Sequence, residues 1–354
     1  MEPGSPSLLW PLRLSKPAVT VPVAPAGEHS KADERAPSPS LTDRLSAAPS
    51  PSSPAPASPA PASPSPPQHQ FQAALVAEKY LLLEQVEGSS LCRCVDVRTQ
   101  EEYVCKVVSR DCSSLLQAHY RLDGHPHVNP IHEVLVGDKR VYLIFPRSHS
   151  DLHSYVRARK RLREHEARRL FRQMAETVAA CHEQGIVLRD LKLRKFVFAD
   201  PQRTTLKLES LEDAVVLDDP EEDLLQDKRG CPAYVSPEIL RAHRTYSGRA
   251  ADMWSLGVIL YTMLVGRYPF NDSEHASLFA KISRGYFVVP ECLSSRGKCL
   301  IRSLLRREAC ERLSARDVLR HPWLARDPRN ELPPRAAASL DRLVPDVPMD
   351  DDYV

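Results

Sequence analysis

Cysteine is the residue type in this chain best suited to metal binding or disulfide chemistry, and the spacing of its nine copies predicts neither. The nearest pair, Cys92 and Cys94, is separated by one residue, which fits neither a zinc knuckle nor a thioredoxin motif. The remaining seven are Cys105, Cys112, Cys181, Cys231, Cys292, Cys299 and Cys310. With no secretory signal at the start of the chain, we expect free thiols in a reducing compartment and no bound metal.

A second group with possible chemistry is a run of five cations in seven residues, namely Arg157, Arg159, Lys160, Arg161 and Arg163. The run has two readings, a solvated helix face or a site for nuclear import or an acidic partner. The formal net charge of +2 indicates no particular partner, and we expect no direct contact with nucleic acid. No segment approaches the roughly 18 apolar residues of a membrane span. We therefore expect a protein of the nucleus and cytoplasm that does not bind membranes.

Composition divides the chain into three zones. Residues 1–71 form a leader that should be disordered, because residues 47–67 contain only Pro, Ala and Ser and have almost nothing to bury. Residues 72–324 have the hydrophobic periodicity of a folded domain. Residues 325–354 contain five prolines and end near an acidic run, so we expect a second disordered tail.

The middle zone starts with strands and continues with helices. Strands are predicted at residues 80–83, 91–97, 102–108 and 141–145. A long amphipathic helix is predicted over residues 164–184, and shorter helices near residues 249–265, 274–284, 295–306 and 314–320. This order predicts an α+β fold with two lobes, a small mainly β N-lobe over residues 72–147 and a large mainly α C-lobe over residues 148–324.

Four segments of this zone resemble protein-kinase motifs, in the order in which kinases have them. Residues 104–106 (Val-Cys-Lys) resemble the strand whose lysine pairs with phosphates. Residues 188–192 (Leu-Arg-Asp-Leu-Lys) resemble the catalytic loop, with Asp190 as its aspartate. Residues 236–238 resemble the end of the activation segment, and residues 252–257 resemble the start of the central helix of the large lobe. Together these segments imply a protein-kinase-like fold.

The same resemblance assigns structural roles to several buried polar and aromatic positions. Residues 311–313 and 321–323 look like the closing helices of a kinase, and Arg312 is then the expected buried partner of Glu238. In this fold Glu238, Asp252, Arg312 and Trp323 would cross-link the large lobe. We expect these residues to serve structure and not chemistry.

The phosphate-binding parts of a kinase are altered in this chain. The loop after the first strand has a single glycine, Gly88, together with Glu84 and Glu87, whose charges would repel a triphosphate. The lysine of the 104–106 segment, Lys106, should pair with a glutamate of the next helix. No glutamate occurs between residues 107 and 132, so the sequence leaves Lys106 without that partner.

The magnesium-binding positions are altered as well. Lys195 stands five residues after Asp190, where kinases have a metal-binding asparagine, and Ser210 stands where they have the metal-binding aspartate. Losing both ligands predicts phosphoryl transfer slower by at least about three to five decades. Lys106 and Asp190 would then be vestigial. The alternative is that Glu212 or Asp213 slips into the metal site.

These departures together resemble the Tribbles pseudokinases. The match is close in residues 191–196, 208–213, 231–238 and 261–270. The resemblance implies a protein that binds other proteins, is not an enzyme and needs no cofactor, although weak binding of ATP without metal stays open.

The tail contains a second segment that resembles this family. Residues 341–346 (Asp-Arg-Leu-Val-Pro-Asp) resemble its short motif for docking on the constitutive photomorphogenic E3 ubiquitin ligase. The docking residues would be Asp341, Leu343, Val344, Pro345 and Asp346. The family usually has glutamine where this chain has Arg342, a difference that bears on affinity. A Val-Pro pair is a preformed extended anchor, and the flanking acids suit a basic-rimmed pocket.

A third segment, residues 318–324, resembles the region that binds MAP kinase kinases in this family. The contact residues would be Leu319, His321, Pro322, Trp323 and Leu324. The His-Pro-Trp sequence also occurs in true kinases as packing, and the sequence leaves both readings open.

The resemblance implies an adaptor. The folded domain would capture a CCAAT/enhancer-binding transcription factor while the tail recruits the ligase, which raises the concentration of one near the other. Binding to MAP kinase kinases and to Akt would modulate their signalling. Two alternatives remain: a weak, metal-independent Ser/Thr kinase that uses Lys106 and Asp190, and a competitive decoy that never uses the tail.

Overall fold

The computed structural model describes residues 12–14, 19–21, 73–86, 90–241 and 244–325, the first two ranges through their backbone only. Everything below concerns these residues. The tail motif at residues 341–346 lies outside them.

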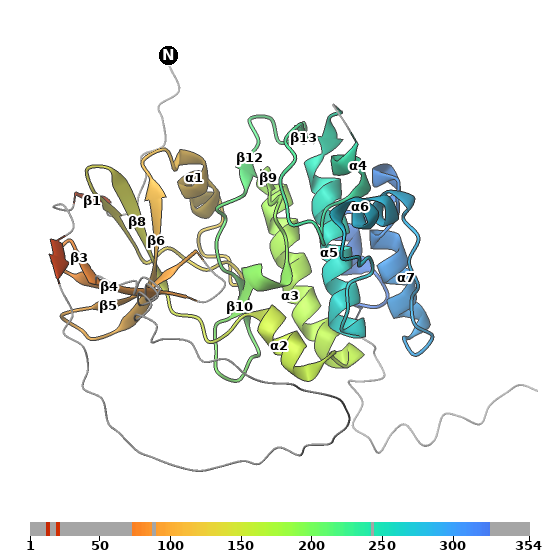
Figure 1. Ribbon diagram of the computed structural model, residues 1–354, viewed down its shortest axis with the longest axis horizontal. Helices are drawn as coiled ribbons and strands as arrows, with labels where there is room; N and C mark the ends of the chain where they lie inside the picture. Colours follow the sequence, from red (N-terminus) through yellow and green to blue (C-terminus); the bar gives the residue numbers. More distant parts are fainter. Residues whose placement is uncertain (1–11, 15–18, 22–72, 87–89, 242–243, 326–354) are drawn as a thin grey trace, which may run out of the picture.

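The N-lobe is built on one curled eight-stranded sheet, with strand order β1-β7-β8-β6-β5-β4-β3-β2 (Figure 1). The strands are β1 Leu12–Leu14, β2 Val19–Val21, β3 Ala73–Val76, β4 Tyr80–Gln85, β5 Cys92–Asp96, β6 Glu102–Ser109, β7 Glu133–Val136 and β8 Arg140–Pro146. Only the β1–β7 pair is parallel among the neighbours in this sheet. The four strands predicted from the sequence are confirmed as β4, β5, β6 and β8.

Two of these strands come from the leader, where the sequence analysis predicts none. β1 pairs with β7 and β2 pairs with β3, so the leader contributes a strand at each end of the sheet. Sheet edges present unpaired N–H and C=O groups that readily accept another strand, and Val-Thr-Val in β2 suits that role. The rest of the leader lies outside the described residues.

The C-lobe is mainly helical and lies beside the sheet (Figure 1). Its helices are α2 Leu152–Arg159, α3 Glu164–Glu183, α4 Pro237–Leu240, α5 Gly248–Val265, α6 His275–Arg284, α7 Ser295–Leu304 and α8 Ala315–Arg320, with 3₁₀ turns η1 Leu193–Lys195 and η2 Ala309–Glu311. Short strands pair as β9 Ile186–Val187 with β12 Val215–Val216, β10 Phe196–Phe198 with β11 Leu206–Leu208, and β13 Leu224–Leu225 with β14 Tyr246–Ser247. Helix α1, Ser113–Arg121, belongs to the N-lobe. The predicted α+β, two-lobed kinase-like fold is confirmed.

One apolar core runs through both lobes. It joins Val104 and Leu143 of the sheet to Leu170 of α3 and Trp254 of α5. Helix α3 buries the apolar face expected from its spacing, and nearly all of α5 is buried, as a central helix should be. A smaller cluster covers the opposite face of the sheet. Within the described residues, no helix is both long and apolar enough to span a bilayer.

The predicted partnership of Arg312 with Glu238 is confirmed. The guanidinium of Arg312 donates to both carboxylate oxygens of Glu238, at N···O distances of 2.5 and 2.7 Å. It also donates to the backbone carbonyls of Ala250 and Arg306. This buried, two-pronged ion pair links α4, α5 and the η2 turn.

Candidate functional site

Lys106 lies on β6 with its side chain buried, and the structure gives it two partners. Its ammonium Nζ contacts the carboxylate of Glu212 and the hydroxyl of Ser90. Ser90 in turn donates to Glu212 at 3.3 Å, so the three side chains form one hydrogen-bonded cluster. Helix α1, the next helix, contains no glutamate, as the sequence indicates, but Lys106 still has a carboxylate partner. Glu212, from the segment after β11, supplies the charge that the next helix does not.

Two side chains hold the backbone of the segment that carries Glu212 by hydrogen bonds. Ser210 is buried, and its hydroxyl accepts from the backbone N–H of Glu212 at 3.2 Å. His119 of α1 accepts from the backbone N–H of Leu211 at 3.4 Å. Burial lowers the pKa of His119 to about 3, so its imidazole is neutral at pH 7 and one ring nitrogen can accept. Ser210 thus shapes the turn that aims Glu212 at Lys106.

Lys195 ends the η1 turn and forms a second lysine–acid pair. Its Nζ donates to Oδ2 of Asp213 at 2.7 Å. Burial alone would raise the pKa of Asp213, but the hydrogen bond and charge of Lys195 outweigh it and hold that pKa below its ordinary value. Asp213 thus lies beside Lys195, the altered metal-binding position, while Glu212 lies beside Lys106.

Asp190 forms a third pair. Lys192 donates to its carboxylate at an N···O distance of 2.5 Å. Asp252 anchors the loop around Asp190, because its carboxylate accepts from the backbone N–H groups of Leu188 and Arg189 at 2.8 and 2.9 Å. This is the cross-linking role expected of Asp252.

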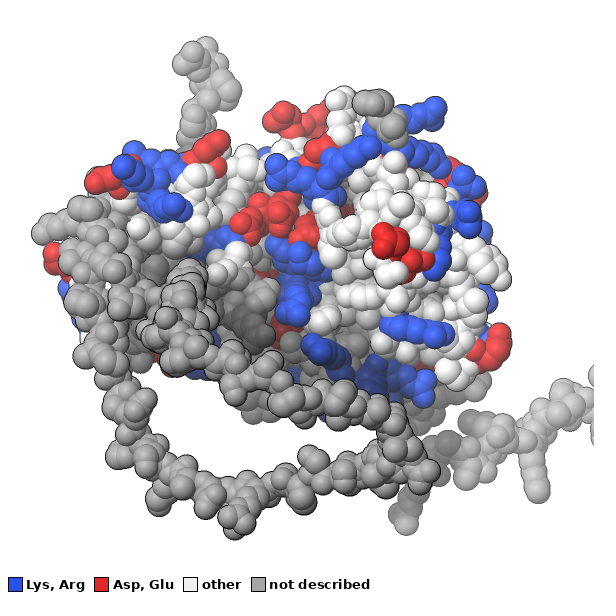
Figure 2. All heavy atoms as spheres, viewed as in Figure 1, with Lys and Arg blue, Asp and Glu red and all other residues white. Residues whose placement is uncertain are grey.

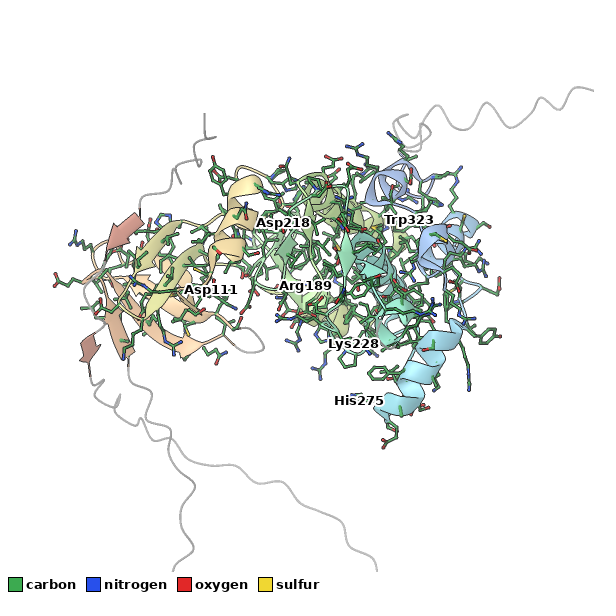
Figure 3. The ribbon with its side chains drawn as sticks, turned by 90° about the horizontal axis from the view of Figure 1, so that it is seen from above. Asp111, Arg189, Asp218, Lys228, His275 and Trp323 are labelled. Atoms are coloured by element: carbon green, nitrogen blue, oxygen red, sulfur yellow. The ribbon has the colours of Figure 1, made fainter. Side chains whose placement is uncertain are left out.

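Arg189 also ties the loop to the activation segment. Its backbone has φ of 62°, in the left-handed region, and its guanidinium contacts Asp227 at 2.5 Å and the carbonyl of Asp213 at 2.6 Å. Figure 3 shows Arg189 in the C-lobe, near its junction with the N-lobe. Its two contacts anchor the segment that follows Asp213.

The three pairs share one electrostatic consequence. Lys106, Lys192 and Lys195 each contact a carboxylate of the same chain, and all three act on the charge of Asp213. Figure 2 shows acidic and basic side chains side by side where the lobes meet. In the described part of the chain, no group of three or more His, Cys, Asp or Glu could hold a metal ion.

The arrangement leads to comparison with known proteins. Residues 85–324 match the protein kinase domain family. The chain is 54% identical to Tribbles homolog 2 of Mus musculus over 275 residues, covering 77% of this chain and 80% of that protein. The chain belongs to the Tribbles family. It is also 53% identical to Tribbles homolog 3 of Rattus norvegicus, over 76% of this chain and 77% of that protein. The identity to Tribbles homolog 1 of Homo sapiens is likewise 53%, over 69% of this chain and 66% of that protein.

Membership in the Tribbles family points to a kinase-like fold of the pseudokinase type. The ion pairs involving Glu212 and Asp213 are what sequence reasoning missed. Their signal was present as two adjacent acids at positions 212 and 213, but their partners, Lys106 and Lys195, are brought to them only by the folded path of the chain.

The other predicted site on this domain, residues 318–324, lies at the end of α8. Trp323 and Leu324 are buried, and the indole N–H of Trp323 donates to Glu164 at 2.9 Å. Its ring also packs edge-on against Phe171. Figure 3 shows Trp323 in the C-lobe, away from the N-lobe. These contacts fit packing, and they leave Pro322 exposed and Leu319 and His321 partly exposed.

Proposed function

We propose that this Tribbles-family protein is a pseudokinase adaptor: it binds substrate proteins and brings an E3 ubiquitin ligase to them. The observation that supports the first half is the set of three lysine–acid pairs formed by Lys106, Lys192 and Lys195. Phosphoryl transfer depends on positioning and on cations that neutralise phosphate charge. A cleft whose lysines are neutralised internally offers little of either.

The second half rests on the tail motif. A short docking segment on an extended tail, joined to a folded binding domain, holds two partners at a high effective concentration without any catalysis. The chemistry of residues 341–346 suits the constitutive photomorphogenic ligase, and the proposed substrates are CCAAT/enhancer-binding transcription factors. Such an adaptor would act in the nucleus as well as the cytoplasm. Binding to MAP kinase kinases and to Akt, which would modulate their signalling, belongs to the same proposal.

The adaptor function is tested by capture of the ligase with the full chain. We expect the double variant Val344→Ala, Pro345→Ala to lose ligase capture at least about tenfold, as removal of about 1.4 kcal/mol or more would require. The matched control is Leu332→Ala, Pro333→Ala, which alters an apolar–proline pair elsewhere in the tail. Equal capture by both variants, or unchanged turnover of bound substrate without residues 341–354, would leave the decoy reading in its place.

A further inference from the structure

A pocket with basic side chains lies on the C-lobe, between helix α2 and the loop that follows α5 (Figure 1). Its volume is about 360 Å³. Arg157 of α2, Lys160 at the C-terminal cap of that helix and Arg267 of the loop line it, and we call it the basic pocket. No Asp or Glu lines it among the described residues. Figure 2 shows basic side chains along the lower edge of the C-lobe, at the end where α2 lies.

The run of five cations near α2 does not face one way. Arg159 forms an ion pair with Glu166 at 3.6 Å, and Arg161 contacts the thiol sulfur of Cys292 at 3.7 Å. The two members of the run that line the basic pocket form no ion pair with a carboxylate of the described residues, and neither does Arg267. The run is therefore not one uniformly solvated helix face, because two of its charges line a recess without an acidic partner.

Backbone contacts hold the two walls of the basic pocket together. Gly266 has φ of 80°, and a Cβ at this position would lie 1.9 Å from the carbonyl oxygen of Lys160, so only glycine fits there. The backbone N–H of Leu162 donates to the carbonyl of Met263 at 2.8 Å. The end of α2 thus packs directly on the end of α5, and a ligand does not have to assemble the pocket first.

The neighbouring turn η1 adds to the positive charge. Its Arg194 is exposed and forms no ion pair with a carboxylate of the described residues. Burial, followed by the charges of Arg194 and Arg157, holds the pKa of His153, which also lines the pocket, below its ordinary value. Asp151 opposes these charges, but its carboxylate accepts from the backbone N–H and the hydroxyl of Ser154 at 2.9 and 2.6 Å. The local charge around the pocket is therefore positive.

This charge matches a phosphate better than a carboxylate. A phosphate monoester carries a charge of about −1.5 to −2 at pH 7 and has three strong acceptor oxygens. Arginine binds such a group through two parallel hydrogen bonds, and lysine binds it as a point charge. The hydroxyl of Tyr268, another lining residue, accepts from Tyr234 at 3.3 Å, which leaves its own hydrogen for a ligand oxygen.

The surroundings of the basic pocket favour a protein as the carrier of that phosphate. Helices that bind membrane surfaces present large apolar side chains beside their cations, and none of the large apolar side chains exposed among the described residues lines this pocket. Nucleic acids attract proteins with a strong positive field, whereas the formal net charge here is only +2. A closed recess also suits one phosphate group better than a phosphate backbone.

We propose that the basic pocket binds the phosphate of a phosphorylated side chain in a partner protein. Arg157, Lys160 and Arg267 donate to the phosphate oxygens, and Tyr268 adds a neutral donor. The pocket is separate from the lysine–acid pairs and from residues 341–346, so phosphate recognition does not depend on recruitment of a ligase.

The proposal is tested by binding of peptide libraries to the full chain. The libraries have randomised flanks around a central phosphoserine, phosphothreonine or phosphotyrosine, and matched libraries have the unmodified residue or glutamate at the centre. We expect retention of the phosphorylated libraries alone. The double variant Arg157→Gln, Lys160→Gln should lower that retention at least about tenfold, because it removes two charge-assisted contacts.

The matched control is Arg159→Gln, Arg161→Gln, which removes the same charge from the same run but from side chains with partners elsewhere. It should bind the phosphorylated libraries as the unaltered chain does. Arg267→Gln tests the opposite wall and should also lose binding, whereas Arg284→Gln, an exposed cation of α6, should not. All of these side chains are exposed, so the variants should fold.

Several results would overturn the proposal. Equal losses in the two double variants would mean that bulk charge, and not the pocket, holds the peptides. Equal retention of the glutamate libraries would show a site for carboxylates. No retention of phosphorylated libraries, together with pocket-dependent binding of inorganic phosphate alone, of phosphoinositide-containing phosphatidylcholine vesicles or of an oligonucleotide, would assign the pocket to that ligand instead.

Discussion

The chemistry of the cleft depends on which carboxylate each lysine meets. Lys106 retains the residue type that pairs with phosphates in kinases, but its charge is directed to Glu212 within the chain. Lys195 reverses the charge of a metal-binding position and uses Asp213 as its counter-ion. Because a buried or half-buried charge is costly without a partner, each of these lysines and its carboxylate compensate one another.

If the Glu212 carboxylate competes with nucleotide for Lys106, a variant with a neutral side chain at position 212 should bind nucleotide more tightly. We expect Glu212→Gln to show a larger rise in melting temperature with ATP than the unaltered chain, with or without magnesium. Saturation at a hundred times Kd would add about 2.7 kcal/mol to the free energy of unfolding. Glu222→Gln, an exposed acid of the same activation segment, is the control. Identical ATP responses in all three proteins would remove Glu212 from this role.

The sequence alone identified the kinase-motif positions Lys106, Asp190, Lys195 and Ser210, because the motifs around them have fixed spacing. It could not place Glu212 or Asp213. Their partners come from a strand and a turn more than ten residues away in sequence, and only the three-dimensional path of the segment after β11 joins them.

At the scale of elements, buried polar side chains cross-link the C-lobe, because they form hydrogen bonds with backbone groups of neighbouring helices and turns. Arg312 is the clearest example, since its side chain is 1% exposed and it serves Glu238 and the carbonyls of Ala250 and Arg306 together. Removing one partner of such a pair leaves a buried charge and unpaired acceptors. The fold therefore depends on this residue far more than on a surface arginine.

Substitution of Arg312 measures that dependence. Arg312→Met should lower the free energy of unfolding by about 3–5 kcal/mol, because Glu238 stays buried without its partner. Arg316→Met removes an arginine whose side chain is 66% exposed and pairs with Glu183. That control should lose less than about 1 kcal/mol. Similar losses in urea unfolding for the two variants would contradict the assigned role.

Elements with strong periodicity were predictable, and short or weakly marked ones were not. The helix predicted over residues 164–184 matches α3, since its apolar face recurs over five turns. Helix α1 was missed because it has nine residues, no side-chain cap and no acid in its first turn. The leader strands were missed because three residues form a strand only when a sheet edge is present to receive them.

At the scale of the whole molecule, the chain joins a kinase-like domain to a leader and a tail. The leader adds strands at both edges of the N-lobe sheet. In the proposed adaptor the domain would supply the binding surfaces and the tail the ligase motif. None of these roles needs phosphoryl transfer. Proximity alone suffices to promote modification of a bound substrate by a recruited ligase.

The most direct test of the central claim is the rate of ATP turnover by the purified full chain, with and without magnesium. The replaced metal-binding positions, Lys195 and Ser210, predict a rate at least about three to five decades below that of ordinary kinases, which turn over about 1–100 times per second. They also predict that Asp190→Ala leaves this residual rate unchanged. Turnover at an ordinary kinase rate that Asp190→Ala abolishes would contradict the account.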